Sequence, residues 1–288
     1  MKICRSISSL TKRVSEIKKQ GKTVGLVPTM GFLHQGHKSL RKARKDTDCV
    51  IVSIFVNPTQ FCPKEDFKKY PRDLEKDYML CERQGVDIVF APGIKEMYPE
   101  NYATYVNVEG VTDILCGASR PGHFRGVTTV VSKLFNIAMP DIAYFGQKDS
   151  QQAIVIKKMA QDLNMRVKIK VMPIVREKDG LAMSSRNIYL GKEQRFQAQL
   201  IYRSLEAARH LFNLGEKDSK AIVRKMTQVI NEQPAIKIDY LKIVNPENLK
   251  DVKIISKKAL AVIAVKIGKT RLIDNIMLNP KRGDYHDA

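Results

Sequence analysis

Two histidines three residues apart lie in a glycine-containing segment directly after an apolar run. The segment reads Pro28-Thr-Met-Gly-Phe-Leu-His34-Gln-Gly36-His37, and a stretch with helical periodicity follows it. A helix N-terminus offers unpaired N–H groups and partial positive charge to phosphate. Two imidazoles there can donate hydrogen bonds to a polyphosphate and, when protonated, stabilise charge on its leaving group. The alternatives are a metal site, for which this segment lacks a third ligand, and two ordinary surface histidines.

Two other polar segments also follow strand-like runs. The first is Ser53-Ile-Phe-Val-Asn57-Pro-Thr-Gln60-Phe, and the second is Phe145-Gly146-Gln-Lys148-Asp149-Ser-Gln-Gln152. We expect Asn57 and Gln60 beside the histidine segment, because ligands of open α/β sheets bind outside the carboxyl ends of the strands. Ordinary turn chemistry is the alternative for Asn-Pro. A lysine at a helix start is poorly matched to the helix dipole unless an anion is also present, which favours phosphate binding by Lys148.

Two arginine-containing segments complete the candidate chemistry. Arg176-Glu-Lys-Asp-Gly180-Leu-Ala-Met183-Ser184-Ser185-Arg186-Asn187 places two hydroxyls and a guanidinium where they can close over a nucleotide triphosphate. One serine could instead cap a helix. Arg120-Pro-Gly-His123-Phe-Arg125 precedes another helical stretch and is less specific.

These segments can bind one ligand only if strands bring them to the same edge of a sheet. Apolar runs alternate with stretches of helical periodicity through the first 175 residues. That alternation predicts an α/β domain with a doubly wound parallel sheet. Predicted strands cover residues 23–29, 50–56, 87–90, 142–145 and 167–171. Predicted helices cover residues 37–45, 73–84, 126–138 and 149–164, and residues 1–20 have a helical rhythm.

The pattern changes in the last hundred residues. A long helical segment from after Arg186 to about residue 212 is followed by a predicted helix over 219–231 and strands over 236–244 and 259–267. We therefore predict a first domain over residues 1–178, a smaller α+β domain over 179–280 that closes over the active site, and a loose tail over 281–288. The charged segment 176–180 is the expected connection.

Composition narrows the class of protein. The 288 residues contain 50 Lys and Arg against 30 Asp and Glu, a net charge of +20, so polyanions should be attracted. Aromatic residues make up only 7%, and none alternate with a basic stripe, so single-stranded nucleic acid is disfavoured as the main ligand. No apolar run is long enough for a membrane span. Five scattered cysteines and no apolar leader favour reduced thiols and a cytoplasmic location.

Taken together, the segments resemble those of the pantoate–β-alanine ligase family, within the nucleotidylyltransferase superfamily that has the HxGH motif. The resemblance runs from about residue 22 to residue 187. It includes Pro-Thr-Met-Gly, HxGH, Phe-Val-Asn-Pro-Thr-Gln-Phe, Tyr-Pro-Arg, Arg-Pro-Gly-His-Phe-Arg-Gly, Phe-Gly-Gln-Lys-Asp and Leu-Ala-Met-Ser-Ser-Arg-Asn. It implies a Rossmann-like domain. It also implies attack of the (R)-pantoate carboxylate on the α-phosphate of ATP, followed by attack of β-alanine on the acyl adenylate.

The resemblance also implies roles for individual residues. Gln60 and Gln152 would hold pantoate, with Gln60 also close to β-alanine, and His37 would be the proton donor. The groups implied in catalysis are His34, His37, Lys148, Ser184, Ser185 and Arg186. The ATP-binding set is Met30, Gly31, Phe32, Leu33, His34, Gln35, Gly36, His37, Gly146, Gln147, Lys148, Asp149, Val175, Met183, Ser184, Ser185 and Arg186. Mg²⁺ would accompany ATP through ligands that the sequence leaves unknown, with no tightly bound organic cofactor.

The resemblance further implies a homodimer formed through the first domain, with no nucleic-acid or membrane partner. The departures from the family pattern are mild: Gln35 replaces an acidic residue, and Cys62 follows Phe61 where Gly is common. Two rival interpretations stay open. One is an adenylyltransferase that leaves AMP on its product. The other, which the net charge allows, is an RNA-binding protein with a vestigial nucleotide fold.

Overall fold

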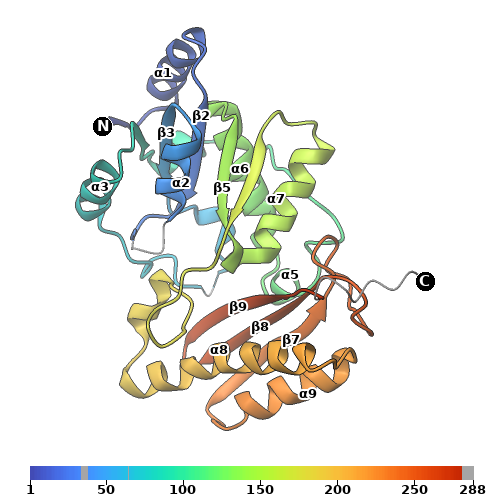
Figure 1. The fold of residues 1–288 in the computed structure, drawn as a ribbon. Helices are drawn as coiled ribbons and strands as arrows, with labels where there is room; N and C mark the ends of the chain where they lie inside the picture. Colours follow the sequence, from blue (N-terminus) through green and yellow to red (C-terminus); the bar gives the residue numbers. More distant parts are fainter. Residues whose placement is uncertain (34–37, 64, 281–288) are drawn as a thin grey trace. The chain divides into compact units, whose positions relative to one another are not determined.

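The computed structural model describes residues 1–33, 38–63 and 65–280 (Figure 1). The chain divides into two compact units. The first contains residues 1–147 and 155–173, and the second contains residues 148–154 and the chain from residue 174 onward. The sequence-based domain boundary after residue 178 stays a prediction, and the tail predicted over residues 281–288 lies outside the described residues.

A six-stranded parallel sheet forms the centre of the first unit, in the order β1-β4-β3-β2-β5-β6. All six residues of β3 are buried, as expected for a parallel strand covered on both faces. The strands are β1 (Lys2–Cys4), β2 (Val24–Thr29), β3 (Cys49–Ile54), β4 (Ile88–Phe90), β5 (Ile142–Gly146) and β6 (Lys168–Met172). The predicted doubly wound parallel sheet is thereby confirmed.

Helices cover this sheet with their apolar faces. Leu40 and Ala43 of α2 join Val50 and Val52 of β3 in one buried cluster, and the Asp73 side chain caps α3 by accepting from the backbone N–H of Lys76. The helices are α1 (Ile7–Lys19), α2 (Ser39–Asp46), α3 (Leu74–Arg83), α4 (Ile94–Met97), α5 (Cys116–Ser119), α6 (His123–Ala138) and α7 (Ser150–Asp162), of which residues 150–154 belong to the second unit. Short 3₁₀ turns are η1 (Pro58–Gln60) and η2 (Gln147–Asp149).

The strand order creates a switch point between β2 and β5. From β2 the chain proceeds outward through β3 to β4, and it then returns to the other side of β2 to form β5 and β6. Ligands of open α/β sheets bind outside the carboxyl ends of the strands at such a point. The segments that begin at Met30 and Asn57 follow β2 and β3, so the fold places these two predicted motifs at one sheet edge of this unit.

The second unit contains an antiparallel sheet in the order β7-β8-β9, with two helices packed on it. Figure 1 shows α8 and α9 side by side on one face of this sheet. Leu205 of α8 and Met226 of α9 are fully buried in the same core as Ile263 of β8. The elements are η3 (Ser185–Tyr189), α8 (Lys192–Asn213), α9 (Ser219–Ile230), β7 (Ile236–Val244), β8 (Ala259–Ile267) and β9 (Thr270–Leu278). This confirms the predicted smaller α+β part.

Several element boundaries differ from the sequence-based prediction. β1 and β9 were not predicted, because β1 has only three residues and Asp274 and Asn275 interrupt the apolar pattern of β9. The helix predicted over 126–138 begins earlier, at His123. The segment after Arg186 begins as a 3₁₀ turn, and α8 starts only at Lys192. The predicted start of a helix at His37 lies outside the described residues.

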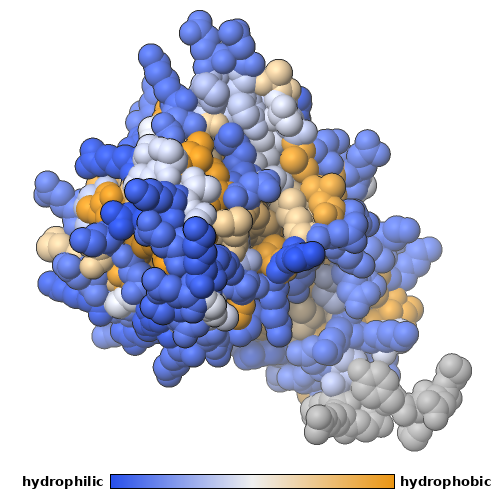
Figure 2. Space-filling model, turned by 90° about the horizontal axis from the view of Figure 1, so that it is seen from above, coloured by the Kyte–Doolittle hydropathy of each residue, from blue (hydrophilic) through white to orange (hydrophobic). Residues whose placement is uncertain are grey.

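The surface is largely hydrophilic where Figure 2 shows it, and the apolar residues there form small scattered groups. No helix in the described part of the chain is long and apolar enough to span a membrane.

Candidate active site

The loop after β2 is held in an unusual backbone conformation by one carboxylate. Gly31 has φ of 80° and Phe32 has φ of 53°, in the left-handed region that non-glycine residues rarely adopt. The backbone N–H groups of Phe32 and Leu33 donate to the two carboxylate oxygens of Asp77 (2.8 and 2.6 Å). A Cβ on Gly31 would lie 2.9 Å from Asp77 Oδ2. Asp77 therefore fixes the loop that leads into the predicted histidine pair.

Asp77 lies on α3 with a side chain almost fully buried. Burial raises the pKa of its carboxyl, and the N–H donors of Leu33 and Phe32 oppose that rise only in part. Met30, Gly31, Phe32 and Leu33 thus lie together in this loop. His34, Gln35, Gly36 and His37, which were predicted to complete the motif, lie outside the described residues.

The side chain of Asn57 fixes the orientation of the Gln60 amide. Asn57 Oδ1 accepts from the hydroxyl of Tyr98 (2.8 Å), and burial raises the pKa of that phenol to about 12, so the phenol is a donor at neutral pH. Asn57 Nδ2 donates to Gln60 Oε1 (3.0 Å) and to the carbonyl of Gly126 (3.1 Å). Since Gln60 Oε1 accepts from Asn57, the NH₂ group of Gln60 faces the other way.

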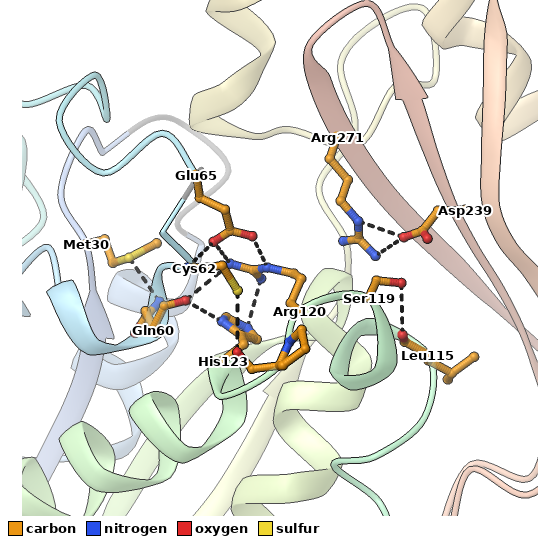
Figure 3. A network of polar contacts seen from close by, with 11 residues as sticks. Met30, Gln60, Cys62, Glu65, Leu115, Ser119, Arg120, His123, Asp239 and Arg271 are labelled. Atoms are coloured by element: carbon orange, nitrogen blue, oxygen red, sulfur yellow. Dashed lines mark hydrogen bonds and ion pairs between the residues drawn. The ribbon is translucent and has the colours of Figure 1, made fainter.

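The Gln60 NH₂ group points at the loop after β2. Gln60 Nε2 donates to the sulfur of Met30 (3.1 Å), as Figure 3 shows. A thioether is a weak acceptor, so a ligand oxygen could replace it. The expectation that Gln60 lies beside the Met30 segment is confirmed, and the buried amide offers a neutral donor at the switch-point edge of the sheet.

A close backbone approach sets the position of η1. A Cβ on Gly126 of α6 would lie 2.3 Å from the carbonyl oxygen of Thr59 and 2.6 Å from the nitrogen of Gln60. These neighbours are backbone atoms, so they cannot rotate aside. Only glycine lets α6 lie this close to the turn that carries Gln60.

In the second unit, the backbone of Lys148 is held by a buried strand residue. Asn275 Nδ2 on β9 donates to the Lys148 carbonyl (3.1 Å), and Asn275 is 2% exposed. Gly146 ends β5 in the first unit, whereas Gln147, Lys148 and Asp149 form η2. Gln152 lies half-buried in the first turn of α7. Lys148 and Asp149 therefore precede the first turn of the helix rather than lying within it.

The segment around Gly180 is held by charged contacts. Arg176 donates to both carboxylate oxygens of Asp274 on β9 (2.5 and 3.1 Å), and Asp274 is 3% exposed. Burial raises the pKa of Asp274, while Arg176 acts in the opposite direction. Arg195 of α8 binds Glu177 (2.7 Å) and Asp179 (2.8 Å). The segment is thus fixed to β9 and to α8.

The predicted nucleotide residues of this segment lie on a compact turn. Met183 N–H donates to the Val175 carbonyl (2.9 Å), which pairs the two predicted positions. The Ser184 hydroxyl accepts from Arg186 N–H (3.2 Å) and caps η3, so the alternative capping role is present for this serine. Ser185 begins η3.

Sequence reasoning missed several residues that hold these segments. The charged and amide groups of Asp77, Asp274 and Asn275 are all buried. Each contacts a predicted site segment far away in the sequence, and only the polar interruption of the β9 pattern could have pointed to the last two.

The described residues contain no group of three His, Cys, Asp or Glu side chains that could hold a metal ion. Mg²⁺ commonly binds through one or two carboxylates and substrate phosphates, with water completing its shell. The expectation that Mg²⁺ accompanies ATP therefore stays a prediction.

The comparisons with known proteins agree over nearly the whole chain. The family model described as pantoate-beta-alanine ligase matches residues 2–277. A pantothenate synthetase of Acetivibrio thermocellus is 55% identical over 279 residues, covering 96% of this chain and 99% of the relative. The pantothenate synthetase of Moorella thermoacetica is 54% identical with the same coverage.

Solved structures lead to the same family. The crystal structure of pantothenate synthetase from Thermus thermophilus is similar with a TM-score of 0.93 and 43% identity, covering 97% of this chain and 100% of that one. A pantoate-beta-alanine ligase from Francisella tularensis, complexed with beta-gamma ATP and beta-alanine, has a TM-score of 0.79 and 35% identity, and covers 96% and 97% of the two chains.

Proposed function

This chain belongs to the pantoate–β-alanine ligase family, and from that membership we propose that it joins (R)-pantoate to β-alanine at the expense of ATP. The pantoate carboxylate attacks the α-phosphate and releases pyrophosphate. The amine of β-alanine then attacks the acyl carbon and releases AMP, leaving pantothenate. No covalent bond to the protein is needed.

The observation that carries this proposal is the placement of the Gln60 amide against the loop after β2. A neutral N–H donor can orient the pantoate carboxylate while leaving its electron density available for attack, whereas a guanidinium would blunt its nucleophilicity. The Gln60 NH₂ group contacts Met30, which belongs to the proposed ATP segment. Nucleophile and nucleotide would therefore meet at the carboxyl ends of β2 and β3. Gln152 is the second proposed pantoate ligand.

Charge moves onto the bridging and pyrophosphate oxygens as the α-phosphate is attacked. Donors aimed at those oxygens stabilise the transition state. We assign that role to six residues, with His37 as the proton donor: His34, His37, Lys148, Ser184, Ser185 and Arg186. Support for the Lys148 assignment comes from its backbone, which Asn275 anchors.

The remaining nucleotide contacts of the proposal are Met30, Gly31, Phe32, Leu33, Gln35, Gly36, Gly146, Gln147, Asp149, Val175 and Met183. Val175 is assigned to the adenine side. We also propose that the smaller domain closes over the bound nucleotide.

Mg²⁺ is the metal of this proposal. When bound to the phosphates it supplies positive charge to the departing pyrophosphate. Asp149 is the one carboxylate among the proposed ATP-binding residues, so we assign it to the ion or its water shell. No tightly bound organic cofactor has a place in the reaction.

Three wider features of the proposal come from the family resemblance and the composition. The protein is proposed to form a homodimer through its first domain and to act in the cytoplasm. Its net charge of +20 is assigned to attraction of anionic substrates and not to nucleic-acid binding.

Product analysis tests the proposed function. The full chain is incubated with ATP, Mg²⁺ and pantoate, with and without β-alanine, and AMP, pyrophosphate and pantothenate are measured. We expect AMP and pantothenate in equal amounts only when β-alanine is present. A stable adenylylated product would instead favour an adenylyltransferase, and salt-sensitive RNA binding without ATP turnover would favour the RNA-binding alternative.

A further inference from the structure

A polar cluster contacts the backbone carbonyl of Gln60, not its side-chain amide. The cluster consists of Glu65, Arg120 and His123, and the proposed reaction gives none of the three a role. Figure 3 shows Arg120 between the Glu65 carboxylate and the His123 ring. His123 Nδ1 lies 2.7 Å from the Gln60 carbonyl oxygen, and Arg120 Nη2 donates to the same oxygen at 3.3 Å.

The partners of His123 fix where its proton lies. Arg120 Nη1 is 2.9 Å from His123 Nε2, and a guanidinium can only donate. His123 Nε2 must therefore accept, and the ring proton must be on Nδ1. That proton is donated to the Gln60 carbonyl, so both ring nitrogens are used in the neutral tautomer, and His123 as a whole is 7% exposed.

Glu65 holds the guanidinium in the orientation that this arrangement needs. Arg120 Nε and Nη2 donate to the two carboxylate oxygens of Glu65 (2.6 and 2.7 Å) in a bidentate pair. Glu65 also accepts from the backbone N–H of Cys62 (3.0 Å), two residues after Gln60. The cluster thus holds the chain on either side of Phe61.

Gln60 ends η1, where a carbonyl has no further helical N–H to pair with. The cluster supplies the missing donors, while Asn57 fixes the amide at the other end of the same residue. We propose that Glu65, Arg120 and His123 are positioning residues that set the orientation of Gln60 for pantoate. This inference rests on the proposed function, because it deepens the role given to Gln60.

The test compares three variants in pyrophosphate exchange with ATP and pantoate. His123→Phe keeps a ring in the site but removes the donor to Gln60. His123→Asn restores an N–H close to the position of Nδ1. Thr128→Val is the matched control, because Thr128 is fully buried on the same helix and donates to the Val106 carbonyl (2.6 Å) without contacting Gln60.

We expect His123→Phe to raise the KM for pantoate about tenfold, equivalent to about 1.4 kcal/mol, and to leave the KM for ATP within about twofold. His123→Asn should recover most of the loss. Thr128→Val should lower the melting temperature about as much as His123→Phe does, since each variant removes a buried hydrogen bond. Both KM values should stay unchanged in Thr128→Val.

The inference is overturned by a pantoate KM that is unchanged in His123→Phe, or by a rise that Thr128→Val reproduces. A fourth variant, Arg120→Met, is assayed by pantothenate formation with β-alanine varied, and the inference is also overturned if it raises the KM for β-alanine alone, because Arg120 would then bind that substrate directly. A parent protein without pantoate-dependent exchange would instead refute the proposed function, so the two failures are distinguishable.

Discussion

Replacing Gly126 with alanine perturbs the proposed pantoate site without touching any group that is proposed to contact substrate. The new Cβ would lie 2.3 Å from the Thr59 oxygen, 2.4 Å from the Thr59 carbonyl carbon and 2.6 Å from the Gln60 nitrogen. All three are backbone atoms of η1. Either α6 or η1 must therefore move by about 1 Å to restore ordinary van der Waals contact.

The expected size of the effect follows from that displacement. Overpacking of this kind costs about 1–3 kcal/mol of stability, and a displacement of about 1 Å at a reacting group can cost about 10²-fold in rate. The hydrogen bond from Asn57 to the Gly126 carbonyl (3.1 Å) would be strained as well. We predict that Gly126→Ala lowers kcat/KM for pantoate by about 10²-fold, or about 2.7 kcal/mol of transition-state stabilisation.

The assay is pyrophosphate exchange with varied pantoate at saturating ATP, together with thermal unfolding. Thr128→Val is again the control, because it removes a buried hydrogen bond from the same helix. It should lose stability but keep kcat/KM for pantoate. A folded Gly126→Ala protein with the parent kcat/KM would refute the reasoning that the close approach of α6 sets the position of Gln60.

Three further predictions address the phosphate side and the charged groups. Lys148→Ala should slow adenylate formation by at least about 10²-fold, the scale of a lost oxyanion donor, and a loss below about tenfold in single-turnover experiments would contradict the role of the ammonium. Asn275→Ala removes the donor to the Lys148 carbonyl and should slow the same step by about tenfold, close to the free energy of one buried hydrogen bond; a rate within about twofold of the parent would exclude a positioning role. Burial raises the pKa of Glu65, but the hydrogen bonds and charge of Arg120 outweigh it, so the pKa lies below its ordinary value of 4.5. The ion pair therefore stabilises the fold above about pH 4.5, and this stabilisation is lost as the pH falls through the lowered pKa of Glu65. In urea unfolding, the difference in free energy of unfolding between the parent and Glu65→Gln should narrow on acidification. A difference that stays constant with pH would contradict this prediction.

Local sequence patterns predicted the parallel sheet and the polar segments at the carboxyl ends of its strands. The apolar run of β3 and the polar residues after it placed Asn57 and Gln60 at a strand end, and parallel strands bring such ends to one edge. The contact between Gln60 and Met30 confirms that reasoning.

The supporting residues could not be predicted from the same patterns. Asn275 contacts Lys148, which is 127 residues away in the sequence. It lies in β9, where buried polar residues interrupt the alternation of apolar and polar residues that would indicate a strand. Asp77 lies on an amphipathic helix, where an acidic side chain is ordinarily exposed. Only the folded chain reveals that these side chains are buried against backbone groups of the site segments.

Exchange of labelled pyrophosphate into ATP, with pantoate present and β-alanine absent, tests most directly the claim that the reaction passes through a pantoyl adenylate. We predict that exchange occurs only when both Mg²⁺ and pantoate are present. The control is to show that bound pyrophosphate is released freely. If the complete mixture then forms pantothenate but no exchange occurs when β-alanine is absent, the two-step account is contradicted.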